Sequence, residues 1–148
     1  MKLFDRFKSY VIMKKKLNCI LLIDDNAADN RYHQIILEEM NITKRIQIAE
    51  TAMDALDYLK TENQIFPQLI FLDINMPGMN GWAFLEAYQY LYGRQKEQSI
   101  ILILTTSTNP DEKKRAEEIT AVNGYKVKPL SEEMLNEILA HYFSNNTK

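Results

Sequence analysis

The chain has 148 residues, 46% of them hydrophobic and 26% charged, which suits one globular domain with a hydrophobic core. Its 18 basic and 20 acidic residues give a net charge of −2, which excludes bulk electrostatic attraction to nucleic acid or anionic membranes. The single cysteine excludes an internal disulfide, and no apolar run approaches the roughly 20 residues of a membrane-spanning helix, so we expect a cytoplasmic protein without membrane contact.

Residues 1–16 precede the regular pattern and are expected to form an N-terminal extension. Four apolar residues of this segment share one helical face: Leu3, Phe4, Phe7 and Val11. Such a face is typical of a short helix that docks on its own domain, on a partner or on a membrane surface. A disordered tail, or translation that begins at Met13, fits the same residues.

Five short segments rich in apolar residues are predicted to be strands. They are 19–23, 46–49, 69–72, 100–104 and 125–127. Three of these segments, 19–23, 69–72 and 100–104, show no polar alternation. This pattern indicates strands buried on both faces, as in a parallel sheet covered by helices.

Five longer segments with helical periodicity follow these strands. They cover 27–41, a stretch from Thr51, a stretch from near Asn80 to about Tyr92, and stretches that begin at Asn109 and Ser131. In the second, Thr51 and Asp54 have capping-box spacing, and Met53, Leu56 and Leu59 repeat at helical intervals. The alternation predicts an α/β fold: a doubly wound five-stranded parallel sheet of flavodoxin-like order 2-1-3-4-5, with helices on both faces. We expect this domain to span 17–143 and a tail to span 144–148.

Polar residues follow four of the predicted strands. Asp24 and Asp25 follow the first strand, Asp73 the third, Thr105 the fourth and Lys128 the fifth. In such sheets ligands bind outside the carboxyl ends of the strands, at the switch point between strands one and three. Three carboxylates there repel each other, and a divalent cation removes the repulsion. Oxygen ligands with no histidine or thiol nearby suit Mg²⁺ better than Zn²⁺, and the lysine suits an incoming anion.

These residues lie in segments that resemble the receiver domains of two-component signalling, of the single-domain chemotaxis type. The segments are LLIDDN (21–26), FLDINMPGMNG (71–81), ILTTS (103–107) and GYKVKPL (124–130). The resemblance covers about residues 17–143. It implies a response regulator that acts as a phosphoprotein in phosphorelay signal transduction. It also implies no enzyme activity beyond self-catalysed phosphoryl transfer and autodephosphorylation.

The resemblance assigns roles to the acids and to one backbone carbonyl. Asp73 is the expected phosphoacceptor, which takes a phosphoryl group from a phosphohistidine. The expected Mg²⁺ site consists of Asp24, Asp25, Asp73 and the carbonyl of Asn75. A carboxylate is a suitable covalent nucleophile toward phosphorus.

The resemblance also implies a switch. Thr105 and Lys128 are expected to contact the phosphoryl group, and Thr105 is preferred over its neighbour Thr106 because it directly follows the strand. Tyr125 is expected to fill the space that Thr105 leaves when it moves. The bond between Lys128 and Pro129 is expected to be cis.

The implied partners are a sensor histidine kinase or His-phosphotransfer protein and a downstream protein target, with a monomer or a dimer through the face of helix four, strand five and helix five. One alternative is a relay intermediate that passes the group to a phosphotransfer histidine. A second is a phosphatase of the haloacid-dehalogenase kind, which typically needs an acid where Asn75 stands. A third is a degenerate receiver that binds partners without phosphorylation. His33 and His141 are interpreted as surface or packing residues.

Overall fold

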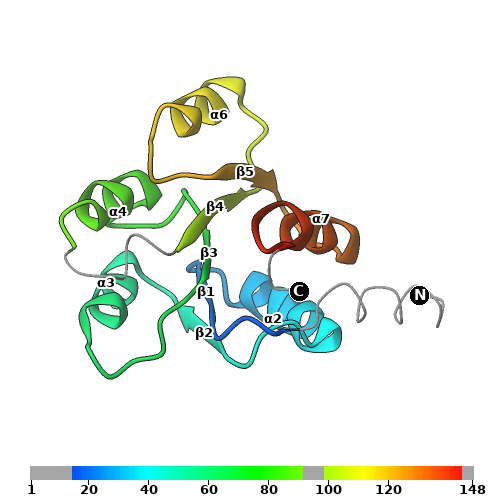
Figure 1. The fold of residues 1–148 in the computed structure, drawn as a ribbon. Helices are drawn as coiled ribbons and strands as arrows, with labels where there is room; N and C mark the ends of the chain where they lie inside the picture. Colours follow the sequence, from blue (N-terminus) through cyan, green and yellow to red (C-terminus); the bar gives the residue numbers. More distant parts are fainter. Residues whose placement is uncertain (1–14, 92–98, 145–148) are drawn as a thin grey trace.

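A computed structural model describes residues 15–91 and 99–144 (Figure 1). The strands are β1 (Ile20–Ile23), β2 (Ile46–Ala49), β3 (Leu69–Leu72), β4 (Ile100–Thr105) and β5 (Gly124–Val127). The helices are α2 (Ala27–Met40), α3 (Ala52–Lys60), α4 (Gly81–Tyr88), α6 (Pro110–Glu117) and α7 (Glu132–Tyr142). Within these two described ranges, no helix combines the length and hydrophobicity that crossing a bilayer requires. Most of the predicted extension and tail lies outside the described residues, so the domain boundaries stay a prediction.

The five strands form one parallel sheet in the order β2-β1-β3-β4-β5. In register, Ile20 of β1 lies between Ile46 of β2 and Leu69 of β3. β1 and β3 are buried along their whole length, whereas the edge strands β2 and β5 are mostly half-buried. The predicted doubly wound sheet and its strand order are confirmed.

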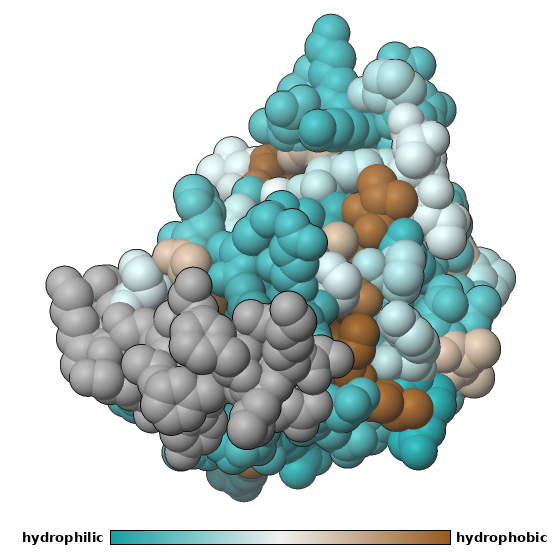
Figure 2. Space-filling view, turned by 90° about the vertical axis from the view of Figure 1, so that its right-hand side faces the viewer, coloured by the Kyte–Doolittle hydropathy of each residue, from teal (hydrophilic) through white to brown (hydrophobic). Residues whose placement is uncertain are grey.

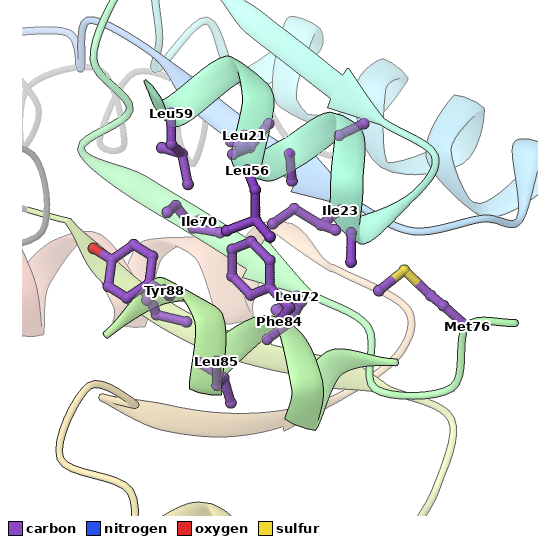
Figure 3. Close-up of a cluster of buried hydrophobic side chains, with 14 of the residues drawn as sticks. Leu21, Ile23, Leu56, Leu59, Ile70, Leu72, Met76, Phe84, Leu85 and Tyr88 are labelled. Carbon is purple, nitrogen blue, oxygen red and sulfur yellow. The ribbon is translucent and has the colours of Figure 1, made fainter. Parts of the chain in front are cut away.

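Successive residues of the central strands point to opposite faces of the sheet, so each strand contributes to two separate cores. Ile20 and Leu22 belong to the core under α2 and α7. Leu21 and Ile23 belong to the core under α3 and α4, where Phe84 packs from α4 (Figure 3). Figure 1 shows the same division, with α2 and α7 on one side of the sheet and α3 and α4 on the other. The unbroken apolar strands are therefore explained by burial on both faces.

Each of the five described helices begins after a residue whose side chain accepts a hydrogen bond from a backbone N–H of the first turn. These capping residues are Asn26, Thr51, Asn80, Asn109 and Ser131. Each such cap contributes about 1 kcal/mol to helix stability. The predicted helix starts are therefore confirmed by the capping geometry.

Three details of the predicted elements are wrong. Met53 does not belong to the buried face of α3, since it is 52% exposed. Leu56 and Leu59 are buried as expected, and Ala52, Ala55 and Tyr58 complete the buried face. α4 ends at Tyr88, earlier than expected. Thr105 is the last residue of β4 rather than the residue after it, because it pairs in register with β5.

Candidate functional site

The candidate site lies where β1 and β3 end side by side. Asp24 follows β1 and Asp73 follows β3, and both carboxylates are buried, while the neighbouring Asp25 is exposed. One carboxylate oxygen from each of the three acids lies within 4.8 Å of the others. The parallel pairing of β1 with β3 causes this convergence, because residues at equivalent positions of neighbouring strands meet at the same edge.

Backbone hydrogen bonds hold the two buried acids in place. The N–H of Asp73 donates to the carbonyl of Ile23 at 2.9 Å, and the N–H of Asp24 donates to the carbonyl of Ala49 at 3.1 Å. Asp24 Oδ1 also accepts a 2.9 Å hydrogen bond from the backbone of Asn26. Both acids therefore extend the hydrogen-bond ladder of the sheet and are placed as firmly as the strands.

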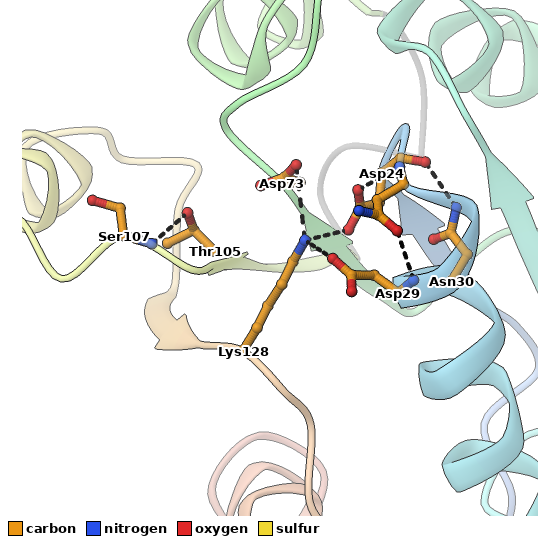
Figure 4. Close-up of polar contacts among 8 residues, drawn as sticks. Asp24, Asp29, Asn30, Asp73, Thr105, Ser107 and Lys128 are labelled. Carbon is orange, nitrogen blue, oxygen red and sulfur yellow. Dashed lines mark hydrogen bonds and ion pairs between the residues drawn. The ribbon is translucent and has the colours of Figure 1, made fainter.

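The ammonium group of Lys128 lies among three carboxylates (Figure 4). Its Nζ is 2.6 Å from Asp24 Oδ2, 2.8 Å from Asp29 Oδ2 and 3.9 Å from Asp73 Oδ2. The Lys128 backbone N–H donates to the carbonyl of Thr105 at 2.7 Å, which fixes the start of this loop against the end of β4. The lysine that sequence reasoning placed opposite the acids is therefore in contact with them.

The pKa values of the buried groups follow from this arrangement. Burial and the charge of Asp24 raise the pKa of Asp73 from 3.8 to about 6, although Lys128 and the backbone N–H of Asn75 oppose the change. Burial lowers the pKa of Lys128, but its hydrogen bonds to Asp24 and Asp29 outweigh burial, so this pKa is raised overall. Burial and the neighbouring negative charge thus disfavour the ionised form of Asp73, and a bound cation would offset this effect.

Sequence reasoning missed two residues of α2 beside the site, and one expectation was wrong. A small cavity of about 10 Å³ is lined in part by Asp24, Asp73, Asn30 and His33. A histidine therefore lies close to the acids, contrary to expectation, and burial lowers its pKa. It is not one of the described residues whose ligand atoms cluster within 4.8 Å. Asn30 Nδ2 donates to the carbonyl of Asp24 at 2.8 Å, and no sequence signal marked either side chain.

Asp29 is the third residue that sequence reasoning missed. It lies in the first turn of α2, where its backbone N–H donates to the capping Asn26, an ordinary position for an acid. Its carboxylate contacts Lys128, which is 99 residues away in sequence. One sequence feature could have indicated this position: the predicted helix starts directly after Asp24 and Asp25, so its first turn must lie near the carboxyl end of the first strand.

The residues predicted to form a switch lie around the end of β4. Thr105 is fully buried, while Thr106 is exposed. Thr105 Oγ1 accepts a 3.2 Å hydrogen bond from the N–H of Ser107, and the Tyr125 hydroxyl donates to the carbonyl of Ser107 at 3.0 Å. Both predicted switch residues therefore form a hydrogen bond with the backbone of Ser107.

The loop after Asp73 is shaped by its turn residues. Asn75 is exposed, and its backbone N–H donates to the Asp73 carboxylate. Gly78 has a φ of +73°, in the left-handed region that favours glycine. Gly81 lies so close to the strand end that a Cβ there would be 2.7 Å from Ile74 Cα and 2.8 Å from the Asp73 carbonyl oxygen. The Lys128–Pro129 bond is cis, as predicted.

Trp82 takes part in packing, as expected for a residue near the start of α4. It is half-buried against the core beneath α3 and α4. The guanidinium carbon of Arg115 lies 4.3 Å from the centre of its ring, so a cation–π contact joins α6 to α4.

The donor set fits a hard divalent cation. Three carboxylates converge, and among the described residues this cluster contains no sulfur or nitrogen ligand. Burial and the charge of Asp24 also raise the pKa of Asp73, so a nearby cation would stabilise its ionised form. Mg²⁺ accepts such oxygen ligands, usually one or two carboxylates with waters and a phosphate. The acids are therefore compatible with Mg²⁺ binding.

Solved structures have a fold similar to that of this chain. A two-component response regulator from Cytophaga hutchinsonii has a TM-score of 0.77 and 29% identity, over 86% of this chain and 98% of that one. The Mn²⁺-bound form of the response regulator Rcp1 has a TM-score of 0.66 and 28% identity, over 84% of this chain and 90% of that one. The sheet and its strand order thus have the fold of response regulator receivers.

The family model described as response regulator receiver domain matches residues 20–140. The chain belongs to this family, and the predicted resemblance is confirmed. A curated relative, the probable methanogenesis regulatory protein FilR2 of Methanothrix harundinacea, is 33% identical over 119 residues, which cover 78% of this chain and 75% of that protein. The sensor histidine kinase GacS of Pseudomonas protegens is 27% identical over 81% of this chain but only 12% of its own length.

Proposed function

We propose that this chain is a response regulator that accepts a phosphoryl group on Asp73 in a Mg²⁺-dependent reaction and then changes a protein-binding face. The observation that carries the proposal is the placement of Asp73, buried at a strand end beside two further acids and 3.9 Å from Lys128. Receiver domains are phosphoacceptors, and membership of this family supports the same role here.

In the proposed reaction, a carboxylate oxygen of Asp73 attacks the phosphorus of a phosphohistidine. The new O–P bond forms as the P–N bond breaks, and the imidazole nitrogen keeps the electron pair. Reactions of this type depend mainly on positioning and on stabilising charge on the transferring oxygens. The backbone bonds of Asp73 provide the positioning, and Lys128 provides a cation.

Mg²⁺ would be held by Asp24, Asp25, Asp73 and the carbonyl of Asn75. When bound, it offsets the negative charge of the acids and of the phosphoryl oxygens. The convergence of the three carboxylates within 4.8 Å supports this assignment of ligands.

We assign the switch to Thr105 and Tyr125. The phosphoryl oxygens are strong acceptors that attract a hydroxyl donor. Thr105 Oγ1 accepts from Ser107, whose carbonyl also accepts from Tyr125, so movement of Thr105 disturbs the contact that holds the tyrosine. The result is a two-state element biased by a local charge.

The proposed partners are a sensor histidine kinase or His-phosphotransfer protein as donor and a protein target downstream. The proposed target surface is the face of α6, β5 and α7, which also serves a dimer if one forms. Figure 2 shows the side of the molecule on which α7 and α2 lie, where the surface that is not grey is mainly hydrophilic with separate hydrophobic groups. We propose a cytoplasmic location because histidine kinases draw their phosphoryl group from ATP.

The deciding experiment is incubation with acetyl phosphate or phosphoramidate and Mg²⁺, read by intact mass. The wild type is expected to gain one phosphoryl group. Asp73→Asn is expected to gain none, while Asp57→Asn, which changes an exposed acid on α3, is expected to behave as the wild type. No gain by the wild type, or an equal gain by Asp73→Asn, contradicts the proposal.

A further inference from the structure

The ammonium group of Lys128 is not equally close to the three carboxylates around it. Its Nζ lies closer to Asp24 and Asp29, at 2.6 and 2.8 Å, than to Asp73, at 3.9 Å. The ammonium is therefore held on the α2 side of the crevice, away from the proposed phosphoacceptor. The Lys128 side chain is only 8% exposed, so solvent supplies little of the compensation that its charge needs.

In the proposed function, Lys128 and a divalent metal ion compete for the carboxylate of Asp24. It is the nearest carboxylate to Lys128, and it is also one of the three acids that converge on the proposed metal site. A divalent cation that draws Asp24 away leaves a buried ammonium with one partner fewer. Removing one partner of a buried ion pair is strongly unfavourable because the other charge stays uncompensated.

Asp29 is the carboxylate that can keep Lys128 paired. Among the described residues it contacts Lys128 but is not one of the acids whose oxygens cluster within 4.8 Å. Its side chain is 35% exposed, so water solvates part of its negative charge and the free-energy cost of keeping it ionised is small. It is fixed to the first turn of α2 by its backbone bond to Asn26, which gives the carboxylate a defined place.

We propose that Asp29 is a positioning residue for Lys128. It keeps the ammonium paired when a metal ion draws on Asp24, and it holds the same ammonium back from Asp73 until a phosphoryl group competes for it. This inference rests on the proposed function. It adds a fourth carboxylate to the site, one that acts on Lys128 rather than on the metal.

The two effects have opposite signs in an Asp29→Asn variant. Lys128 loses its alternative partner and binds Asp24 more tightly, so metal binding weakens, and loss of a nearby negative charge acts in the same direction. At saturating metal, Lys128 is free to approach Asp73, and one charge that repels an anionic donor is gone, so phosphoryl transfer becomes faster. A variant that only loosened the site would lower both the affinity for the metal ion and the rate of phosphoryl transfer.

The test uses Mn²⁺ as the probe, with free ion counted by electron paramagnetic resonance, so its first readout does not depend on phosphorylation. Asp29→Asn is expected to raise the Kd for Mn²⁺ by about threefold to tenfold. At saturating Mn²⁺ it is expected to speed the reaction with acetyl phosphate severalfold. Asp29→Glu is expected to restore both values toward the wild type.

Glu39→Gln is the matched control. It removes the same charge from an exposed position of α2 that lies ten residues further on, about 15 Å along the helix. This variant is expected to match the wild type in both measurements. A Kd for Asp29→Asn that equals that of Glu39→Gln, or a slower reaction at saturating metal, overturns the inference.

Failure of the inference and failure of the proposed function give different results. If the wild type is phosphorylated but Asp29→Asn matches Glu39→Gln, Asp29 has no positioning role and the proposed function stands. If the wild type accepts no phosphoryl group, the proposed function fails. The Mn²⁺ affinities then still decide whether Asp29 acts on Lys128.

Discussion

Asp73 and Asp24 line the same small cavity at the ends of two neighbouring strands, and both are nearly buried, at 7% and 5% exposure. Burial and this close acid together raise the pKa of Asp73 to about 6. In a metal-free site this carboxyl therefore ionises only as the pH rises through about 6, and the free-energy cost of its charge at neutral pH is a physical reason for the site to attract a cation.

The first prediction concerns the pH dependence of stability without metal. Because the pKa of Asp73 in the folded protein lies above its ordinary 3.8, the folded state binds this proton more tightly than the unfolded state does. The contribution is present below about pH 4 and is lost as the pH rises through about 6. We expect this carboxyl to reduce the free energy of unfolding by about 2 kcal/mol between those limits.

Asp73→Asn isolates this contribution, since the amide does not ionise. In metal-free buffer the variant is expected to be more stable than the wild type at pH 7.5, and the difference is expected to vanish near pH 4. Urea unfolding at both pH values measures it. A variant that is less stable than the wild type at pH 7.5 contradicts the raised pKa.

The second prediction separates metal binding from folding at Asp25. This acid is exposed, so Asp25→Asn is expected to change the metal-free stability by no more than about 0.5 kcal/mol. Mg²⁺ at 100 times the wild-type Kd is expected to stabilise the wild type by about 2.7 kcal/mol. Asp25→Asn is expected to gain much less, because one proposed ligand is missing.

Urea unfolding with and without Mg²⁺ provides the measurement. Asp57→Asn is the control, since it removes the same charge from an exposed position of α3. Equal stabilisation of Asp25→Asn and the wild type by Mg²⁺ rules out Asp25 as a ligand.

The sheet and the strand-end residues could be predicted because they depend on local signals. Unbroken apolar segments marked the buried strands, and parallel pairing then brought Asp24 and Asp73 together without knowledge of side-chain packing. The local sequence pattern was therefore enough to predict the location of residues whose place in a strand determines their place in the fold.

Residues on helices could not be placed in this way, because the rotation of a helix about its axis is set by its tertiary contacts. Met53 fits the periodicity of α3 but points outward, since the alanines of that helix pack on the sheet. Asp29 and His33 lie beside the site because of how α2 rests on β1 and β3. Their residue types alone indicated only a helix start and a packing residue.

The third prediction tests the choice between two neighbouring threonines. Thr105 is buried and accepts a hydrogen bond from Ser107, so Thr105→Ala is expected to cost about 1–2 kcal/mol of stability. Thr106 is exposed, and Thr106→Ala is expected to stay within about 0.5 kcal/mol of the wild type. Thr105→Ala is also expected to lose the change at Tyr125 that follows phosphorylation.

Amide chemical shifts of β5, recorded before and after addition of acetyl phosphate and Mg²⁺, report this change. Thr106→Ala serves as the matched control and is expected to respond as the wild type. If Thr105→Ala keeps the response and Thr106→Ala loses it, the switch hydroxyl belongs to Thr106.

The fourth prediction concerns the two glycines of the loop after Asp73, which are required for different reasons. A Cβ at Gly81 would lie 2.7 Å from Ile74 Cα and 2.8 Å from the carbonyl oxygen of Asp73, and such backbone atoms cannot rotate away as a side chain can. Gly81→Ala is therefore expected to destabilise the protein by about 3 kcal/mol. The displaced strand end is also expected to weaken the response to Mg²⁺.

Gly78→Ala is the matched comparison. A Cβ there meets nothing within 4 Å, but the φ of +73° costs an alanine about 1 kcal/mol. Alanine also restricts the unfolded chain at both positions, so this effect cancels between the two variants, and their difference compares the close contact at Gly81 with the φ cost at Gly78. Urea unfolding is expected to rank Gly81→Ala as the less stable by about 2 kcal/mol. The opposite ranking would mean that backbone conformation, rather than the approach of α4 to Asp73, requires glycine in this loop.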